Sequence, residues 1–271
     1  MPVMLLPEVE YVRPSTVDEA VRLLGANDGA RALAGGQTLT NVMKARAAAP
    51  DVLVDLNGLD ELRAIRRTDD GGVEIGAMAT YTEMARSTEI GEARPILAEV
   101  VAQIADVQVR NRGTIGGNVC SSDPTNHLPP LFAALGATMT IRGPEAERTV
   151  SASDFFLGVY MTAVGQGELL TKVMLPPANG RDAFEAVTIG RDGTCIVNAA
   201  ANVDGEARVA IGCVAAVPVV FETEPEEQAV RDRVANAVVD PPSDVHASAD
   251  YRRHLAVVLA VRALRRAKGG T

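Results

Sequence analysis

The sequence predicts an α+β protein that is built in modules. Three features predict this class: a strand–loop–helix–strand unit near the N-terminus, a mixture of helices and strands in the middle, and a meander of strands followed by two helices near the C-terminus. The 271 residues, 47% of them hydrophobic, supply enough apolar side chains for more than one core. A second region begins near Asn57, and the Pro-Pro and Asn-Gly pairs within residues 176–180 form the strongest break in the chain. The expected units are residues 1–57, 58–177 and 178–271.

The N-terminal unit is expected to begin with a helix. Ser15 followed by Asp18 and Glu19 is typical of a helix start, because a short polar side chain caps the first turn and acidic side chains stabilise it. The elements expected in this unit are that helix, ending at Gly25 or Asn27, a strand over residues 31–34, a helix over 37–46 and a strand over 52–56.

The middle unit mixes both kinds of element. Its expected strands cover residues 73–77, 137–141 and 168–175, and its expected helices cover 81–87, 95–104 and 128–135. Residues 107–120 are polar, rich in glycine and show little periodicity, so they predict no regular element.

The C-terminal unit is expected to hold a three-stranded antiparallel sheet with helices. Its expected strands cover residues 183–189, 196–204 and 206–214, and its expected helices cover 224–238 and 246–267. Asp204-Gly205 between the second and third strands is a favourable hairpin turn.

Composition excludes several classes of protein. A net charge of −9, three lysines and 3% aromatic residues argue against binding of nucleic acid, through either the phosphate backbone or base stacking. The longest apolar stretches, residues 213–221 and 255–264, are shorter than the roughly 20 residues of a membrane span, and the first residues show no signal peptide. Three cysteines without Cys-x-x-Cys spacing favour a reducing compartment. We therefore expect a globular, cytoplasmic protein.

Two Gly-Gly segments carry the strongest functional signal: residues 33–38 (LAGGQT) and 114–118 (TIGGN). Adjacent glycines allow positive φ and leave no Cβ in the way of a ligand. The first segment follows an expected strand and precedes an expected helix, so its N–H groups and the helix dipole favour a phosphate or pyrophosphate. The second would offer a similar nest of N–H donors, with side-chain hydrogen bonds from Thr114 and Asn118. Each segment could instead be only a tight turn, and neither matches a Rossmann or Walker A motif.

Other polar residues give weaker signals. The three histidines are scattered and form no cluster with metal-ligand spacing, so a zinc site is not expected. The last expected helix carries arginines that either form a solvated face paired with acidic residues or dock on a partner subunit. These arginines are Arg252, Arg253, Arg262, Arg265 and Arg266.

The two Gly-Gly segments and their surroundings resemble one known family. The runs AGGQTLTNVMKAR (residues 34–46) and QVRNRGTIGGNVCSSDPTNHLPPLFAALGA (108–137) resemble the FAD-binding medium subunit of molybdenum hydroxylases, which includes the carbon monoxide dehydrogenase flavoprotein and the flavin domain of xanthine dehydrogenase. The opening YVRPSTVDEAVRLL and the tail PPSDVHASADYRRHLAVVLAVRAL also fit this family. The resemblance extends from about Tyr11 to about Leu264.

The resemblance implies a PCMH-type FAD-binding fold, in which two α/β subdomains and the C-terminal sheet hold the cofactor. The two Gly-Gly segments would bind the FAD pyrophosphate, and Asp123 would lie near ribityl or ribose hydroxyls. By similarity, the cofactor-binding residues are Leu33, Ala34, Gly35, Gly36, Gln37, Thr38, Leu39, Ile104, Thr114, Ile115, Gly116, Gly117, Asn118, Asp123, His127 and Leu170. The resemblance implies no catalytic side chain and no metal ligand in this chain, because the flavin performs the chemistry.

The chain departs from the family pattern at two places. His127 stands where relatives usually carry an acidic residue that accepts hydrogen bonds from the cofactor. Residues 190–195 contain Arg191 and Asp192, but in a different register from the basic residue and Asp that relatives carry near the flavin ring.

The resemblance implies a place in an electron-transfer complex. Electrons from a molybdopterin-containing large subunit would pass through [2Fe-2S] clusters of a small subunit to FAD, and then to NAD⁺, O2, a quinone or another acceptor. Three cysteines without cluster spacing are consistent with iron–sulfur ligands in a partner. Two alternatives stay open: a stand-alone FAD-dependent oxidoreductase of the same fold, and a paralogue without flavin that serves as a scaffold.

Overall fold

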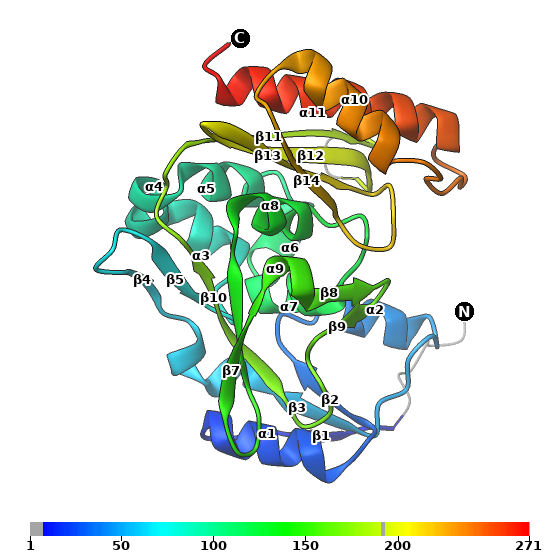
Figure 1. The fold of residues 1–271 in the computed structure, drawn as a ribbon. Helices are drawn as coiled ribbons and strands as arrows, with labels where there is room; N and C mark the ends of the chain where they lie inside the picture. The colour runs from blue at the N-terminus through cyan, green and yellow to red at the C-terminus, as the bar shows by residue number, and fades with distance from the viewer. Residues whose placement is uncertain (1–7, 191–192, 271) are drawn as a thin grey trace.

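The N-terminal and C-terminal parts of the chain form opposite ends of the molecule, with the middle part between them (Figure 1). The computed structural model describes residues 8–190 and 193–270. It has a mixed α+β architecture, as the sequence predicts. Among the residues described, no helix is both long and apolar enough to cross a membrane.

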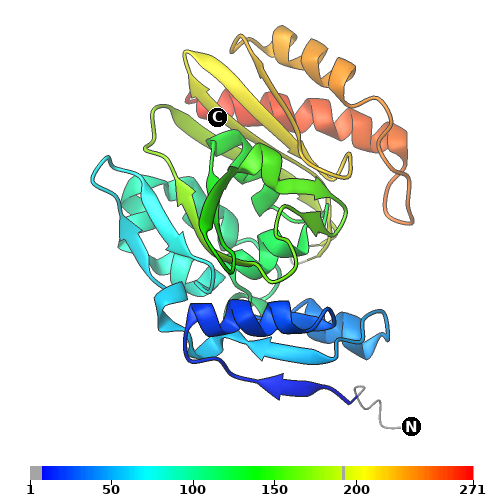
Figure 2. The same cartoon turned by 60° about the horizontal axis from the view of Figure 1, so that its bottom comes forward.

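The N-terminal part is a parallel sheet in the order β1-β3-β2. Its strands are β1 (Glu10–Val12), β2 (Ala30–Leu33) and β3 (Val52–Asp55), and its helices are α1 (Val17–Ala26) and α2 (Leu39–Lys44). Figure 2 shows α1 lying along this sheet. The carboxyl ends of parallel strands share one edge, so the residues that follow β2 and β3 come together there.

The first helix is capped by Thr16 rather than by Ser15, where the sequence analysis placed the helix start. The Thr16 hydroxyl accepts the Glu19 N–H at 3.1 Å, while the Ser15 N–H and hydroxyl donate to the Glu19 carboxylate at 2.7 and 2.8 Å. Thr16 therefore caps the first turn by accepting a backbone N–H, and the Glu19 carboxylate reaches back to accept the hydrogen bonds of Ser15.

The middle part is an antiparallel sheet in the order β4-β5-β10-β6-β7, with helices around it. Its strands are β4 (Ile65–Arg67), β5 (Val73–Gly76), β6 (Thr138–Arg142), β7 (Glu147–Ser151) and β10 (Leu169–Leu175), next to a hairpin of β8 (Phe156–Gly158) and β9 (Met161–Thr162). Its helices are α3 (Tyr81–Arg86), α4 (Thr88–Ala93), α5 (Pro95–Val101), α6 (Val107–Arg110), α7 (Ile115–Ser121), α8 (Leu128–Leu135) and α9 (Ala152–Phe155). Two 3₁₀ turns, η1 (Leu56–Gly58) and η2 (Asp60–Leu62), lead into it.

The expectation that residues 107–120 lack regular structure is wrong, because the segment contains α6 and α7. Each helix has a side-chain cap: Asp106 accepts the Val109 N–H at 2.8 Å, and Thr114 accepts the Gly117 N–H at 3.0 Å. Helix α6 has only four residues, too few for an apolar stripe to repeat, and α7 has two glycines, which are poor helix formers, in its first turn.

The C-terminal part is an antiparallel sheet that has four strands, not the predicted three. Its elements are β11 (Arg181–Thr188), β12 (Cys195–Asp204), β13 (Glu206–Gly212), β14 (Val219–Thr223), α10 (Glu227–Ala237) and α11 (Ala249–Ala267). The fourth strand begins directly after Pro218, whose missing N–H keeps the proline itself out of the ladder. The predicted turn at Asp204-Gly205 is confirmed, with Gly205 at φ +72°.

A buried ion pair connects the middle and C-terminal parts. Arg94, which is 2% exposed, donates to the carbonyls of Pro176 and Pro177 at 3.0 and 3.1 Å and to the Asp182 carboxylate at 2.7 Å. The Asn202 amide donates to the other Asp182 oxygen at 2.7 Å. This network fixes the proline-rich connection at the start of β11.

The division into residues 1–57, 58–177 and 178–271 is a proposal, and its support is the presence of one main sheet in each of the three ranges.

Loss of the Arg94 side chain should destabilise the fold strongly. In Arg94→Met, Asp182 stays buried without its cationic partner, so the free energy of unfolding should fall by about 3–5 kcal/mol. Urea unfolding followed by circular dichroism measures this change. The double variant Arg94→Met/Asp182→Asn should recover much of the loss, because no uncompensated charge remains. A single variant within about 1 kcal/mol of the wild type would contradict this role.

Candidate functional site

The first Gly-Gly segment lies at the carboxyl edge of the N-terminal parallel sheet, between β2 and α2. Leu33 ends β2, Thr38 is exposed, and Leu39 begins α2, so these predicted residues flank the glycines. Gly36 has φ +71°, a left-handed conformation that glycine adopts without strain. Helix α2 has six residues, fewer than two turns, so the helix dipole contributes less here than that of the predicted helix over residues 37–46 would.

Four successive carbonyl groups in this loop accept hydrogen bonds within the chain. The pairs are Ala34 O with Asn57 Nδ2 at 3.0 Å, Gly35 O with Gln37 Nε2 at 2.9 Å, Gly36 O with Thr40 N at 3.1 Å, and Gln37 O with Asn41 Nδ2 at 2.8 Å. In a planar trans peptide the N–H of the next residue points away from the carbonyl. The N–H groups of residues 35–38 therefore point away from these contacts, and in the part of the chain that the structure describes they have no acceptor. Successive free N–H groups around a left-handed residue form an anion-binding nest.

The second Gly-Gly segment forms the first turn of α7, and its N–H groups already have acceptors. Ile115 donates to Ala79 O at 3.0 Å, Gly116 to Ala77 O at 2.8 Å, and Gly117 to the Thr114 hydroxyl at 3.0 Å. The expected nest of free donors is therefore absent from these three N–H groups. A Cβ on Gly116 would lie 2.7 Å from Ala77 O, so this glycine permits close packing of the helix.

The two Gly-Gly segments lie side by side. A Cβ on Gly35 would lie 1.9 Å from the Arg112 carbonyl oxygen, and a Cβ on Gly117 would lie 3.9 Å from the Ala34 Cβ. The structure thus brings together the motifs that the sequence placed about eighty residues apart. Whether residues 114–118 contact a cofactor stays a prediction.

Asn118, the last residue of this motif, makes a buried contact with Tyr81. Its Nδ2 donates to the Tyr81 hydroxyl at 2.9 Å, and its Oδ1 is buried without a partner among the residues described. Burial raises the pKa of Tyr81 to about 12, so its hydroxyl stays protonated.

A buried carboxylate, which sequence reasoning missed, lies beneath the first loop. Asp55 ends β3 and accepts hydrogen bonds from the Tyr11 hydroxyl and from the N–H and side-chain amide of Asn57, at 3.0 and 2.6 Å for the latter two. Arg13 Nε lies 3.3 Å from the same carboxylate. Burial alone would raise the pKa of Asp55, but the hydrogen bonds from Tyr11 and Asn57 outweigh it and hold that pKa below its usual value. The position of Asp55 at the carboxyl end of a strand was the available signal.

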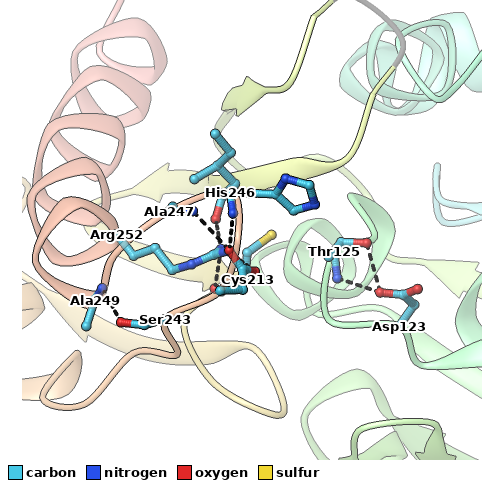
Figure 3. Close-up of polar contacts among 10 residues, drawn as sticks. Asp123, Thr125, Cys213, Ser243, His246, Ala247, Ala249 and Arg252 are labelled. Carbon is cyan, nitrogen blue, oxygen red and sulfur yellow. Dashed lines mark hydrogen bonds and ion pairs between the residues drawn. The ribbon is translucent and has the colours of Figure 1, made fainter.

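Asp123 lies in the turn after α7. Its carboxylate accepts the N–H and the hydroxyl of Thr125 at 2.9 and 2.8 Å (Figure 3). It also raises the pKa of Tyr160, because loss of the phenol proton would place two negative charges together. Tyr160 has φ +56° and is held there by its N–H bond to Ser122 O at 3.0 Å. The contact of Asp123 with cofactor hydroxyls stays a prediction.

Three predicted cofactor residues lie in packed surroundings. His127 is 7% exposed and stacks on Phe184 with ring centroids 5.4 Å apart. Leu170 is 2% exposed and belongs to the core of the middle sheet, and half-buried Ile104 packs against that core. Burial lowers the pKa of His127 to about 4, so its imidazole is neutral at pH 7. These surroundings give all three residues a packing role, and their contact with a cofactor stays a prediction.

The second departure from the family pattern is described only in part, since Arg191 and Asp192 lie outside the described residues. Cys195 is buried, and its sulfur accepts the Asn198 amide N–H at 3.4 Å. The same amide reaches the sulfur of Cys213 at 3.7 Å.

Four of the five arginines of α11 make polar contacts within the chain, while the exposed Arg262 has none among the described residues. Arg252 is buried and donates to the carbonyls of Ile196 and Cys213 and to the Asp244 carboxylate, the last two at 3.2 and 2.6 Å (Figure 3). The other ion pairs are Arg253 with Asp250, Arg265 with Glu227, and Arg266 with Glu99 and Glu185. Arg252 is therefore a buried structural residue, whereas the ion pairs of the other three arginines fit a solvated face paired with acidic residues.

Taken together, the geometry supports binding of an anion by backbone N–H groups at the junction of the N-terminal and middle parts. Among the residues with described positions, no group of three or more His, Cys, Asp or Glu side chains could hold a metal ion.

Comparisons with known proteins agree with this geometry. Residues 7–178 match the family model described as the FAD binding domain in molybdopterin dehydrogenase. The chain is 36% identical to the carbon monoxide dehydrogenase medium chain of Afipia carboxidovorans, with 98% of each chain covered. It is 32% identical to the glyceraldehyde dehydrogenase medium chain of Sulfolobus acidocaldarius, covering 97% of this chain and 99% of the other. Among solved structures, quinoline 2-oxidoreductase from Pseudomonas putida 86 superposes with a TM-score of 0.91 at 31% identity, with 98% of each chain covered.

The buried imidazole should make stability depend on pH. The pKa of His127 is about 4 in the folded chain and near 6.5 when exposed, so between these values a proton binds the unfolded chain preferentially. Stability should therefore fall by about 3 kcal/mol as the pH drops through this window.

Urea unfolding at pH 7 and pH 4.5 measures the effect, and the variant His127→Leu should lose this part of the pH dependence. The exposed His246, replaced in the same way, serves as a control. Equal pH dependence of the wild type and His127→Leu would contradict the assignment.

Proposed function

Because the chain belongs to the family of FAD-binding medium subunits of molybdenum hydroxylases, we propose that it assembles with an iron–sulfur small subunit and a molybdopterin-containing large subunit. In this assembly the chain holds FAD, which accepts electrons from [2Fe-2S] clusters of the small subunit and passes them to NAD⁺, O2, a quinone or another acceptor. Residues 120, 195 and 213 are cysteines without cluster spacing, which supports placing the clusters in a partner.

The observation that carries this proposal is the nest of free N–H groups in residues 35–38. FAD contains a pyrophosphate, and backbone N–H groups bind such an anion without a side-chain cation. Gly36 supplies the left-handed residue, and the loop carries no Cβ at either glycine. The donor set therefore fits the pyrophosphate, although the protein has a net charge of −9.

The remaining predicted residues would complete the cofactor site. We place residues 33–39 and 114–118 along the pyrophosphate, and Asp123 near cofactor hydroxyls. Ile104, His127 and Leu170 would contact the cofactor from the packed positions described above. No side chain of this set is assigned an acid–base role, so the chain binds, orients and shields the cofactor.

Purification of the chain tests the function directly. The expressed protein should be yellow, and the cofactor released on denaturation should be FAD. From the native host, a tagged chain should co-purify with two other subunits, molybdenum and iron. Flavin without these partners would favour a stand-alone oxidoreductase, and a colourless protein that takes up no added FAD would favour the scaffold alternative.

A matched pair of variants tests the position of the pyrophosphate. Asn and Asp have the same size, and both tolerate the left-handed conformation of Gly36 better than other residues do. Gly36→Asp should bind FAD at least about tenfold more weakly than Gly36→Asn, because the added carboxylate repels the pyrophosphate. Titration of the apoprotein with FAD, followed by quenching of flavin fluorescence, measures both affinities. Equal affinities would place the pyrophosphate elsewhere.

A further inference from the structure

Asn57 lies in η1, directly after β3, and connects three parts of the site. Its Nδ2 donates to Asp55 Oδ1 at 2.6 Å and to Ala34 O at 3.0 Å, while its Oδ1 accepts from Arg63 NH2 at 3.4 Å. The charges on either side fix the orientation of the amide, since a carboxylate requires the NH2 group and a guanidinium requires the oxygen. Asn57 therefore has one defined rotamer in which both of its N–H bonds are used.

Four groups donate hydrogen bonds to the loop carbonyls, and Asn57 is the one that lies far from the loop in the sequence. The other three donors belong to residues 37–41, which are part of the loop or of α2 itself. The bond from Asn57 to Ala34 spans 23 residues of sequence and comes from the end of a neighbouring strand. It therefore fixes the loop relative to the sheet, whereas the local bonds fix only its internal shape.

The held Ala34 carbonyl determines where the first N–H of the nest points. The peptide between Ala34 and Gly35 is planar and trans, so the Gly35 N–H is directed away from Asn57. Without the Asn57 bond this peptide could rotate, since glycine places few steric limits on its own backbone. The nest would then lose a donor or hold it in the wrong direction.

Arg63 extends this network to the middle part of the chain. Besides Asn57, its guanidinium lies 3.4 Å from Met78 O and 3.8 Å from the Glu83 carboxylate. The positive charge of Arg63 and the negative charge of Asp55 balance across the amide, so the network orients Asn57 without adding net charge next to an anion site.

We infer that Asn57, oriented by Asp55 and Arg63, is a positioning residue that presents the N–H groups of residues 35–38 to the cofactor pyrophosphate. This assignment rests on the proposed function. In this arrangement Asn57 acts through the loop, since both of its N–H bonds are directed to Asp55 and Ala34.

The test compares Asn57→Ala with the wild-type full-length chain. Loss of the Ala34 contact should weaken FAD binding to the apoprotein about tenfold. At saturating FAD, the ³¹P NMR signals of the bound pyrophosphate should move from their wild-type positions, because the donors around it are rearranged. Arg63→Gln leaves the amide in place but removes its charged partner, and it should change both measurements in the same direction by a smaller amount.

A matched control separates positioning from general stability. Asn202 also donates its amide to a buried carboxylate, that of Asp182 at 2.7 Å, but it lies in the C-terminal sheet. Asn202→Ala should lower the thermal unfolding temperature and leave FAD affinity and the ³¹P signals unchanged. If Asn57→Ala keeps wild-type affinity and ³¹P signals, or if both variants lose affinity equally, the inference is wrong. A wild-type chain that binds no FAD would instead overturn the proposed function, and this assignment with it.

Discussion

The backbone crossing at Gly35 is the constraint on which the site depends. There the first Gly-Gly loop touches the Arg112 carbonyl so closely that a Cβ would overlap it at 1.9 Å. The crossing joins the edge of the N-terminal parallel sheet to the segment that leads into α7. Gly113, the residue after Arg112, packs on the Tyr81 ring, where a Cβ would lie 2.7 Å away. Gly35 thus permits the contact between the N-terminal and middle parts, and Gly113 lets the same segment pack on Tyr81.

In the proposed site, amide groups take the place of the cations that hold anions in many other proteins. The protein carries a net charge of −9 and three lysines, and the loop itself contains no charged residue. Side-chain amides of Gln37, Asn41 and Asn57 hold the loop carbonyls, and the N–H groups opposite them stay available. Below the loop Asp55 stays ionised, but hydrogen bonds and Arg13 surround it. The site can therefore bind an anion although a carboxylate lies close by.

How far the sequence predicts this structure depends on how local each signal is. The strands and helices of eight or more residues agree with the predicted elements, as in α1 and α11, and the family resemblance rests on motifs that can be read directly. The short helices α6 and α7 were not predicted, because α6 has only four residues and α7 has two glycines in its first turn. The partners of the α7 N–H groups, Ala77 and Ala79, could not be foreseen, since they come from the turn after β5. The role of Asn57 likewise depends on a distance between two loops, which no local pattern encodes.

The strand order of the middle sheet has a consequence for biosynthesis. Strand β10 lies at the centre of this sheet, where Val173 pairs with Ile75 on one side and with Met139 on the other, yet it is the last of the five strands to be translated. On the ribosome, β5 and β6 can pair with β4 and β7, but the edge of each that faces β10 stays unpaired until the nascent chain has passed Leu175. Helix α7, with the second Gly-Gly motif, packs against β10 and cannot take its final place earlier. Partial chains released before Leu175 therefore expose sheet edges that invite aggregation.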